Sequence, residues 1–197
     1  EHTIHIGRAH NWADGLTREE AIDRARGKRP EPLIPAHLCV GVRERVDCFG
    51  NVVMPIDPEE VREKVHYLVN QGVRGFIVSF LWSFVNPIHE RKVREIILEE
   101  YPEIYLGHMP ILLSHEVCPK ICEYKRTITT ILDGYLRSQT EIHFLELTDR
   151  LKEKGYQRPL MIVRNTGGVA SVSRTRPVQL YGAGPVAGIM GAAAIGK

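Results

Sequence analysis

The spacing of apolar residues changes several times along this chain and predicts helices that alternate with strands. After Asp57, which begins a typical helix-start sequence, Val61, Val65 and Leu68 recur at the spacing of one helix face. The run 76–82 is almost continuously apolar, as expected for a strand that is covered on both faces of its sheet. This alternation indicates an α/β protein.

Shorter patterns supply the remaining elements. Other strands are predicted from short apolar or alternating runs: Thr3–Ile6, Leu38–Val46 with a hairpin return at Val52–Met54, Ile104–Leu106, Ile111–Leu113 and Leu160–Val163. Other helices are predicted from capping residues and helical spacing: Arg18–Arg26 behind a capping box of Thr17 and Glu20, a helix after Asn86-Pro87, and residues 120–154 with a break near Gly134.

This order of elements divides the chain into three segments. Residues 1–56 form an N-terminal strand, helix, linker and hairpin, and residues 57–157 form an α/β segment that ends in long helices. Residues 158–197 are the start of a second domain with glycine loops. Because the chain begins without Met inside a predicted strand and stops within a predicted helix, we expect a segment of a longer protein.

Charge and hydropathy limit the classes of partner. The 197 residues carry 26 Lys and Arg against 24 Asp and Glu, a formal net charge of +2. Bulk charge therefore gives no reason to expect a nucleic-acid or membrane partner. No apolar run approaches the ~20 residues that a membrane-spanning helix needs.

The cysteine pattern is uninformative about disulfides. Cys39, Cys48, Cys118 and Cys122 match neither a disulfide framework nor a Cys-x-x-Cys pair. Cys118 and Cys122 could share a helix face as half of a metal site, but four reduced thiols in a cytosolic protein are the simpler interpretation. We assign no residue as a metal ligand.

Two glycine loops suggest a nucleotide or phosphate cleft. Each follows or opens a regular element, and their candidate residues are Asn165, Gly167, Gly168, Gly182, Gly184 and Gly188. A glycine turn that opens a helix leaves backbone N–H groups free to meet an anion. The second loop is one residue too long for the dinucleotide fingerprint G-x-G-x-x-G, which excludes a Rossmann interpretation. Close packing of the glycine face without a ligand is an equally good explanation.

Two polar clusters could carry chemistry. Ser114, His115 and Glu116 are the residue types of a hydrolytic triad, but on a strand His115 would point away from the other two. Each could still serve a site with distant partners, or make local hydrogen bonds at a strand end.

A basic cluster offers a different kind of site. Lys125 and Arg126, followed by Thr127, could bind phosphate or carboxylate, although a solvated face is the simpler interpretation. Arg8 and His10 could likewise hold an anion beside a cleft.

Five motifs in order resemble the hydantoinase A / oxoprolinase / acetone carboxylase family. They are Phe80–Glu90, Leu113–Val117, Glu123–Thr127, Asn165–Val169 and Gly182–Gly188. Within this family, the stretches Glu1–His10 and Tyr135–His143 are most similar to the hydantoinase-like, ATP-using subunit of acetone carboxylases.

The resemblance implies a fold and an activity. The fold is an actin-like (ASKHA-type) two-domain ATPase fold, of which this chain is an internal fragment. The activity is that of a cytoplasmic, multi-subunit ligase that activates acetone and bicarbonate by phosphoryl transfer to give acetoacetate. The implied cofactors are ATP with Mg²⁺, together with a carboxylation metal, Mn, in a partner subunit.

The resemblance also orders the candidate residues. It implies that the glycine loops line the nucleotide cleft, that Arg8, His10, Ser114 and Thr127 contact substrate or another domain, and that the catalytic candidates are His115, Glu116, Lys125 and Arg126. Two phosphate loops of the family would precede Glu1 and follow Lys197.

Two residues depart from the family pattern, and two alternative functions stay open. Cys122 stands where a glycine or small residue is expected, and Ala183 where serine is usual. The alternatives are a ring-opening amidohydrolase of the hydantoinase or 5-oxoprolinase type, and a non-catalytic fragment or assembly module.

Overall fold

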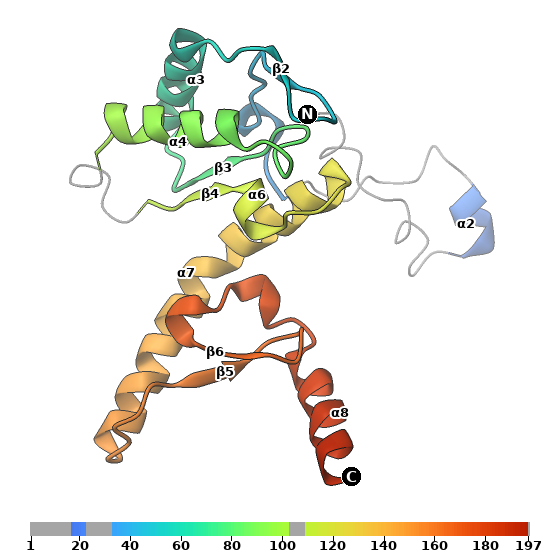
Figure 1. Cartoon of the computed structure of the whole chain (residues 1–197), viewed down its shortest axis with the longest axis vertical. Helices are drawn as coiled ribbons and strands as arrows, with labels where there is room; N and C mark the ends of the chain where they lie inside the picture. The colour runs from blue at the N-terminus through green and yellow to red at the C-terminus, as the bar shows by residue number, and fades with distance from the viewer. Residues whose placement is uncertain (1–16, 23–32, 103–108, 197) are drawn as a thin grey trace. The chain divides into compact units, whose positions relative to one another are not determined.

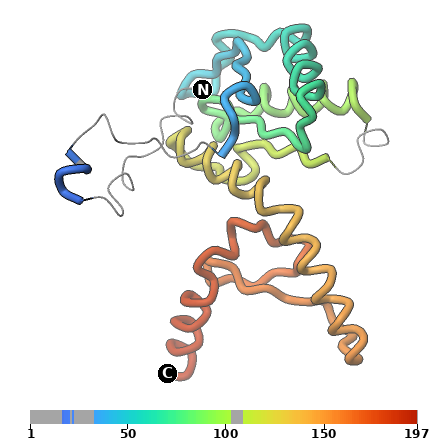
Figure 2. The backbone as a smooth tube through the Cα atoms, turned by 180° about the vertical axis from the view of Figure 1, so that it is seen from behind, coloured from blue at the N-terminus to red at the C-terminus, as the bar shows by residue number. Residues whose placement is uncertain are grey.

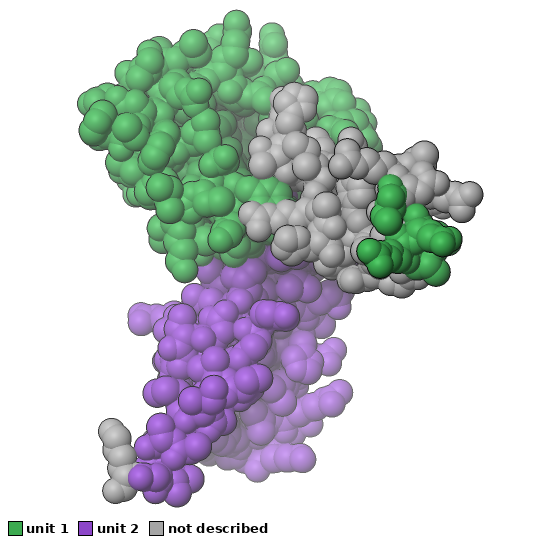
Figure 3. Space-filling view, turned by 90° about the vertical axis from the view of Figure 1, so that its right-hand side faces the viewer, with its two compact units in different colours: residues 1–130 green, residues 131–197 purple. Residues whose placement is uncertain are grey.

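The structure is a computed structural model that describes residues 17–22, 33–102 and 109–196. The strands expected at Thr3–Ile6 and Ile104–Leu106 lie outside these residues, as do Arg8 and His10. The chain divides into two compact units, residues 1–130 and residues 131–197 (Figure 3). We describe each unit by itself.

Unit 1 is built on two parallel strands. Strand β3 (Phe76–Val78) pairs with β4 (Ile111–Leu113) in the register Phe76↔Ile111. Helices α3 (Pro58–Asn70) and α4 (Ile88–Glu100) lie together on one side of this pair (Figure 1). Their apolar faces and the strands form one core of Val61, Val65, Phe76, Val78, Val93, Ile96, Ile97 and Leu113. The α/β prediction is therefore confirmed for this unit.

Capping residues set the helix starts as the sequence predicts. The Asp57 side chain accepts a hydrogen bond of 3.0 Å from the backbone N–H of Glu59 at the start of α3. Before helix α2 (Arg18–Ile22), Thr17 and Glu20 form the predicted capping box, with the Thr17 N–H 2.9 Å from Glu20 Oε2.

The strands are shorter than the sequence predicts. The hairpin forms, but β1 (Arg45–Val46) pairs over only two residues with β2 (Val52–Met54), after a 3₁₀ turn η2 (Ala36–Leu38). Strand β3 ends at Val78, because the chain then turns and Trp82 adopts a φ of 58°. The rest of the run 76–82 lies in this turn, where Phe80 and Trp82 are half-buried and Leu81 is exposed.

Helix α7 (Glu123–Glu153) runs through 31 residues without interruption. The break expected near Gly134 is wrong. A glycine inside a helix costs about 1 kcal/mol relative to alanine, and this local cost does not outweigh the helical preference of the residues on either side.

Unit 2 consists of the second part of α7, a strand pair, two 3₁₀ turns and a terminal helix (Figure 2). Strand β5 (Met161–Val163) pairs antiparallel with β6 (Val169–Ser171), which the sequence analysis did not predict. The turns η3 (Val172–Arg174) and η4 (Pro177–Gln179) lead to helix α8 (Ala183–Ile195).

Helix α8 is apolar throughout. Gly182 precedes it with a left-handed φ of 72°, so Pro185 occupies the third helical position. Proline is tolerated there because the first N–H groups of a helix have no partner inside it. None of the residues of α8 is buried. Among the described residues, no helix combines the length and the apolarity needed to cross a bilayer.

Asp133 is the buried carboxylate of unit 2. Its side chain is inaccessible to solvent, and Oδ1 accepts a hydrogen bond of 3.2 Å from the Val178 N–H. Oδ2 has no hydrogen-bond partner in the described part of the chain, and Arg176 Nη1 lies 3.8 Å from it. Burial raises the pKa of Asp133 above its ordinary value, and the Val178 N–H and the charges of Arg176 and Arg137 oppose this only in part.

Cys122 provides a test of backbone strain. Its φ of 84° lies in the region that favours glycine, which explains why the family pattern expects a glycine or small residue there. We expect Cys122→Gly to increase the free energy of unfolding by about 1 kcal/mol, measured by chemical denaturation. Cys118→Gly is the matched control: Cys118 has a φ of −143°, so this variant should lose stability. A loss of stability in both variants would contradict the strain argument.

The raised pKa of Asp133 predicts a pH-dependent stability. The folded state keeps the proton at pH values where the unfolded state has lost it, so stability falls as the pH rises above 3.8. We expect Asp133→Asn to melt at a higher temperature than the wild type at pH 7, with the difference vanishing below pH 3.8. Glu146→Gln, which removes an exposed carboxylate from the same helix, should change the melting temperature little. A lower melting temperature of Asp133→Asn at pH 7 would show that the charge is stabilising.

Candidate functional site

The polar residues that the sequence singles out gather where β3 and β4 end. After β4, Ser114 begins the short helix α6 (Ser114–Val117), and the first turns of α4 and α7 approach the same place (Figure 1). We call Glu90, Ser114, His115 and Arg126 the buried polar cluster. In parallel α/β sheets, ligands bind beyond the carboxyl ends of the strands, and the cluster lies at that edge.

Glu90 is the centre of the buried polar cluster. Its side chain is inaccessible to solvent. Oε1 accepts hydrogen bonds from the Phe80 N–H at 3.0 Å and from Ser114 Oγ at 2.6 Å. Oε2 accepts hydrogen bonds from the His115 N–H at 3.1 Å and from His115 Nδ1 at 2.6 Å. The carboxylate also lies in the first turn of α4, where the helix dipole favours a negative charge.

Arg126 places a positive charge in the same cluster. Its guanidinium group is buried and donates to Ser114 Oγ at 3.0 Å, to the Lys120 carbonyl at 2.9 Å and to the Phe80 carbonyl at 2.7 Å. It also lies over the Phe84 ring, 5.4 Å from the centroid. The Ser114 hydroxyl accepts from Arg126 and donates to Glu90, so one hydroxyl links the two opposite charges.

His115 is the member of the cluster that can exchange a proton. Because Nδ1 faces the Glu90 carboxylate, we assign its proton to Nδ1, which leaves the lone pair on Nε2. The side chain is 10% exposed, and within the described residues nothing hydrogen-bonds to Nε2. Nε2 can therefore act as a proton acceptor or as a ligand.

Of the three residues Ser114, His115 and Glu116, the structure brings the first two together at Glu90 and places Glu116 elsewhere. The strand assumed for Ser114-His115-Glu116 is wrong, because Ser114 begins a helix, and Ser114 and His115 both bind Glu90. Glu116 instead forms a double ion pair with Arg94, at 2.8 and 2.7 Å.

The predicted basic cluster of Lys125, Arg126 and Thr127 does not form one site, because its members differ in burial. Arg126 and Thr127 are buried, and the Thr127 hydroxyl lies 2.6 Å from Ser79 Oγ, whereas Lys125 is exposed. Glu90 was not predicted as a site residue, and its only signal in the sequence was its position at the end of the motif Phe80–Glu90.

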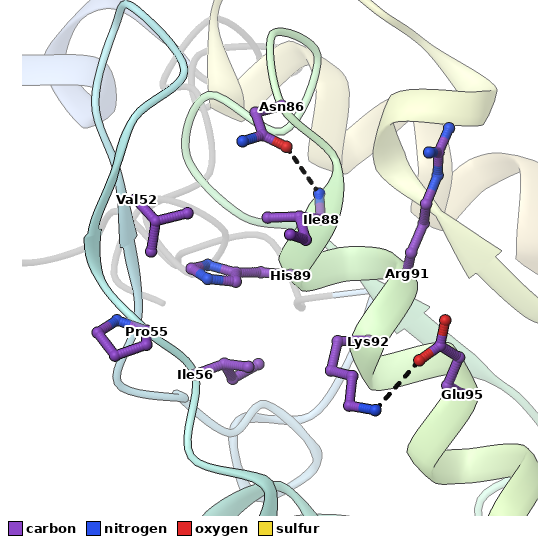
Figure 4. A pocket seen from close by; sticks show the side chains of 9 residues that line it. All are labelled: Val52, Pro55, Ile56, Asn86, Ile88, His89, Arg91, Lys92 and Glu95. Carbon is purple, nitrogen blue, oxygen red and sulfur yellow. Dashed lines mark hydrogen bonds and ion pairs between the residues drawn. The ribbon is translucent and has the colours of Figure 1, made fainter.

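A second histidine and glutamate pair lies in the same unit. His89 Nδ1 is 2.6 Å from Glu44 Oε2, and each side chain is 6% exposed. His89 borders a groove of about 540 Å³ lined by Val52, Pro55, Ile56, Asn86, Ile88, His89, Arg91, Lys92 and Glu95 (Figure 4). The Lys92 ammonium pairs with Glu95 at 3.2 Å. The polar groups of this groove do not converge on one point, so the groove offers no evident chemistry.

The two glycine loops of unit 2 are brought together. Gly167 has a φ of 80° in the turn between β5 and β6, and a Cβ there would lie 3.5 Å from Met190 and 3.7 Å from Val186, both in α8. Asn165 fixes this turn to η4 through a 2.7 Å hydrogen bond from its N–H to the Gln179 carbonyl.

The glycines of α8 face open space. Among the described residues, a Cβ on Gly182, Gly184 or Gly188 would meet no atom within 4 Å apart from its chain neighbours and its own helix backbone. No side chain caps the helix at Gly182. The backbone of the first turn of α8 can therefore be approached closely by a ligand or by another chain segment.

Metal-ligating side chains are not grouped in the described part of the chain. Within residues 17–22, 33–102 and 109–196, no three His, Cys, Asp or Glu side chains converge. All four cysteines fall in these ranges, and none of them forms a disulfide bond there.

Comparison with known proteins identifies the family of the chain. The family model for the hydantoinase/oxoprolinase N-terminal region matches residues 10–101, and the hydantoinase/oxoprolinase model matches residues 126–197. The acetophenone carboxylase gamma subunit of Aromatoleum aromaticum is 45% identical over 193 residues, which are 98% of this chain and 26% of that protein.

Solved structures agree with the sequence matches. The nucleotide-free structure of acetone carboxylase, solved in a study of ATP-dependent acetone carboxylation, matches 98% of this chain and 27% of that chain, with a TM-score of 0.79 and 31% identity. ATP-dependent caprolactamase from Pseudomonas jessenii matches 83% of this chain and 24% of that chain, with a TM-score of 0.71 and 28% identity. The chain spans about a quarter of the length of these relatives. The two family models together span most of its residues, and the chain belongs to the hydantoinase/oxoprolinase family.

Proposed function

We propose that this chain is part of a subunit of an ATP-dependent ketone carboxylase. The parent enzyme activates acetone and bicarbonate by phosphoryl transfer and joins them to give acetoacetate, which makes it a ligase that forms a carbon–carbon bond. The single observation that carries this proposal is the similarity to two ketone carboxylases over 98% of the chain. The higher identity, 45%, is to an acetophenone carboxylase subunit, so an aryl ketone is the competing substrate.

The glycine loops are the proposed nucleotide contacts. In an actin-like (ASKHA-type) fold, the turn that holds Asn165, Gly167 and Gly168 and the start of α8 at Gly182, Gly184 and Gly188 would line the nucleotide cleft. The open space above the α8 glycines fits this role, because phosphate oxygens can approach backbone N–H groups only where no side chain intervenes. When bound, ATP supplies the phosphoryl group that activates the substrate.

Metal ions and partners complete the proposal. We infer that Mg²⁺ is bound together with ATP in the parent enzyme, and that the carboxylation metal, Mn, belongs to a partner subunit. The partners are the other subunits of a cytoplasmic hetero-oligomer. Lys125 and Glu116, which the resemblance makes catalytic candidates, lie outside the buried polar cluster.

The match to caprolactamase favours one second candidate function. It supports an ATP-dependent amidohydrolase that opens a lactam, hydantoin or 5-oxoproline ring. Both functions use ATP to activate a carbonyl oxygen, so the shared fold does not separate them. The substrate that stimulates ATP consumption does.

Substrate-dependent ATP consumption is the direct test. For the intact protein with its co-purifying subunits, we expect ATP consumption only when a ketone and bicarbonate are both present, with formation of the corresponding β-keto acid. Acetone and acetophenone should be compared side by side. The 197-residue chain alone should consume no ATP. ATP consumption with a lactam, hydantoin or 5-oxoproline, and none with either ketone, would overturn the proposal in favour of the amidohydrolase.

Gly184→Ala tests the nucleotide contact at α8. In the open space above Gly184 the new methyl group meets no described atom, and alanine is the better helix former, so thermal stability should be unchanged or higher. If a nucleotide approaches this backbone, the KM for ATP should rise about tenfold, equivalent to ~1.4 kcal/mol.

Gly191→Ala is the matched control, because Gly191 lies in the same helix and is equally open. It should leave the KM for ATP unchanged. An equal effect of both variants on subunit assembly, with no effect on ATP, would show that the glycine face packs against protein.

A further inference from the structure

We propose that His115, oriented by Glu90, is the base that removes a proton from the carbon next to the substrate carbonyl group. This inference rests on the proposed ketone carboxylase function. A ketone that forms a new bond at this carbon must first lose a proton from it, so the reaction needs a base. Imidazole is the side chain most often used for such a transfer near neutral pH.

Glu90 fixes the orientation of the His115 imidazole ring, which would remove the proton. Its Oε2 lies 2.6 Å from His115 Nδ1, while its Oε1 is held by Ser114 Oγ at 2.6 Å and by the Phe80 N–H at 3.0 Å. A carboxylate held at both oxygens cannot turn away, so the Nδ1 proton stays in place and the lone pair stays on Nε2. Glu90 is thus a positioning residue, and its charge stabilises the imidazolium that forms when Nε2 takes a proton.

The accessibility of His115 fits a base that meets a small substrate. Its side chain is 10% exposed, and among the described residues nothing hydrogen-bonds to Nε2. The ring lies at the carboxyl edge of β3 and β4, the edge at which α/β sheets bind ligands. The neighbouring turn contains Trp82 with a φ of 58°, and such strained residues concentrate at functional sites.

The proton transfer balances without a further reagent. Nε2 uses its lone pair to bind the proton, and the carbon–hydrogen bond breaks. Its electron pair becomes the second bond between that carbon and the carbonyl carbon. The electron pair of the carbonyl double bond moves onto the oxygen, which becomes the nucleophile for phosphoryl transfer in the proposed function.

The other candidate groups are less suitable. Glu116 is a poorer candidate because its carboxylate is already paired with Arg94, at 2.7 and 2.8 Å. Lys125 is a poorer candidate because its side chain is exposed and lies outside the buried polar cluster. His89 has the same kind of carboxylate partner, Glu44, at 2.6 Å. However, it borders the groove beside β2 instead of the buried polar cluster (Figure 4). The His89 pair is therefore a matched control.

Hydrogen exchange of the ketone isolates this step. The intact protein with its subunits is incubated in D₂O with ketone and a non-hydrolysable ATP analogue, without bicarbonate, and deuterium next to the carbonyl is measured by mass spectrometry. His115→Asn places an amide N–H near the position of Nδ1, so the bond to Glu90 can be kept while the base is lost. We expect exchange to fall at least about 100-fold, with unchanged affinity for the nucleotide analogue. His89→Asn should exchange within about threefold of the wild type, because His89 borders a different groove.

The outcomes separate the inference from the proposed function. Exchange by His115→Asn at the wild-type rate, or equal losses in both variants, would overturn the role of His115. Ketone-dependent ATP consumption by the wild type without any exchange would overturn the proton transfer alone. Absence of ketone-dependent ATP consumption would overturn the proposed function and, with it, the inference. If His115→Asn does not fold, as judged by its melting temperature, His115→Gln replaces it in the same comparison.

Discussion

The hydrogen bonds to the Glu90 carboxylate are the interaction on which the rest of unit 1 depends. Burying a lone carboxylate costs several kcal/mol, and the cost is offset only when the charge is paired and hydrogen-bonded. Four donors from the turn after β3 and from α6 meet this requirement. Glu90 can therefore be buried only when both segments are in place. The carboxylate joins α4 to the carboxyl ends of both strands.

Arg126 completes the same constraint from the start of α7. It bonds to the Phe80 carbonyl, while Glu90 bonds to the Phe80 N–H, so two opposite charges hold one peptide segment. The Ser114 hydroxyl lies between Glu90 and Arg126 and forms a hydrogen bond with each of them. The bonds that lower the cost of burial also fix the His115 ring. In this site the requirements of stability and of chemical orientation are met by the same contacts.

Local sequence was a good guide wherever the determining contacts are local. The caps at Asp57 and Thr17 act within three residues, and both were predicted correctly. The sequence also selected Ser114, His115 and Arg126. It did not identify Glu90 as the partner of Ser114 and His115, because these two residues are 24 and 25 positions away from it along the chain. The expected break at Gly134 failed because one unfavourable residue does not interrupt a long helix.

The sequence by itself determined the class of fold, the helix starts at Thr17 and Asp57, the family and the residue types available for chemistry, since these depend on spacing, capping and ordered motifs. Only the tertiary structure decided which of those residues meet. It separated Glu116, which pairs with Arg94, from Ser114 and His115, and it brought the turn at Gly167 against α8. The physical reason is that the partners of a buried charge depend on which hydrogen-bond donors lie close to it in three dimensions and on how far it is desolvated. Neither local spacing nor composition contains this information.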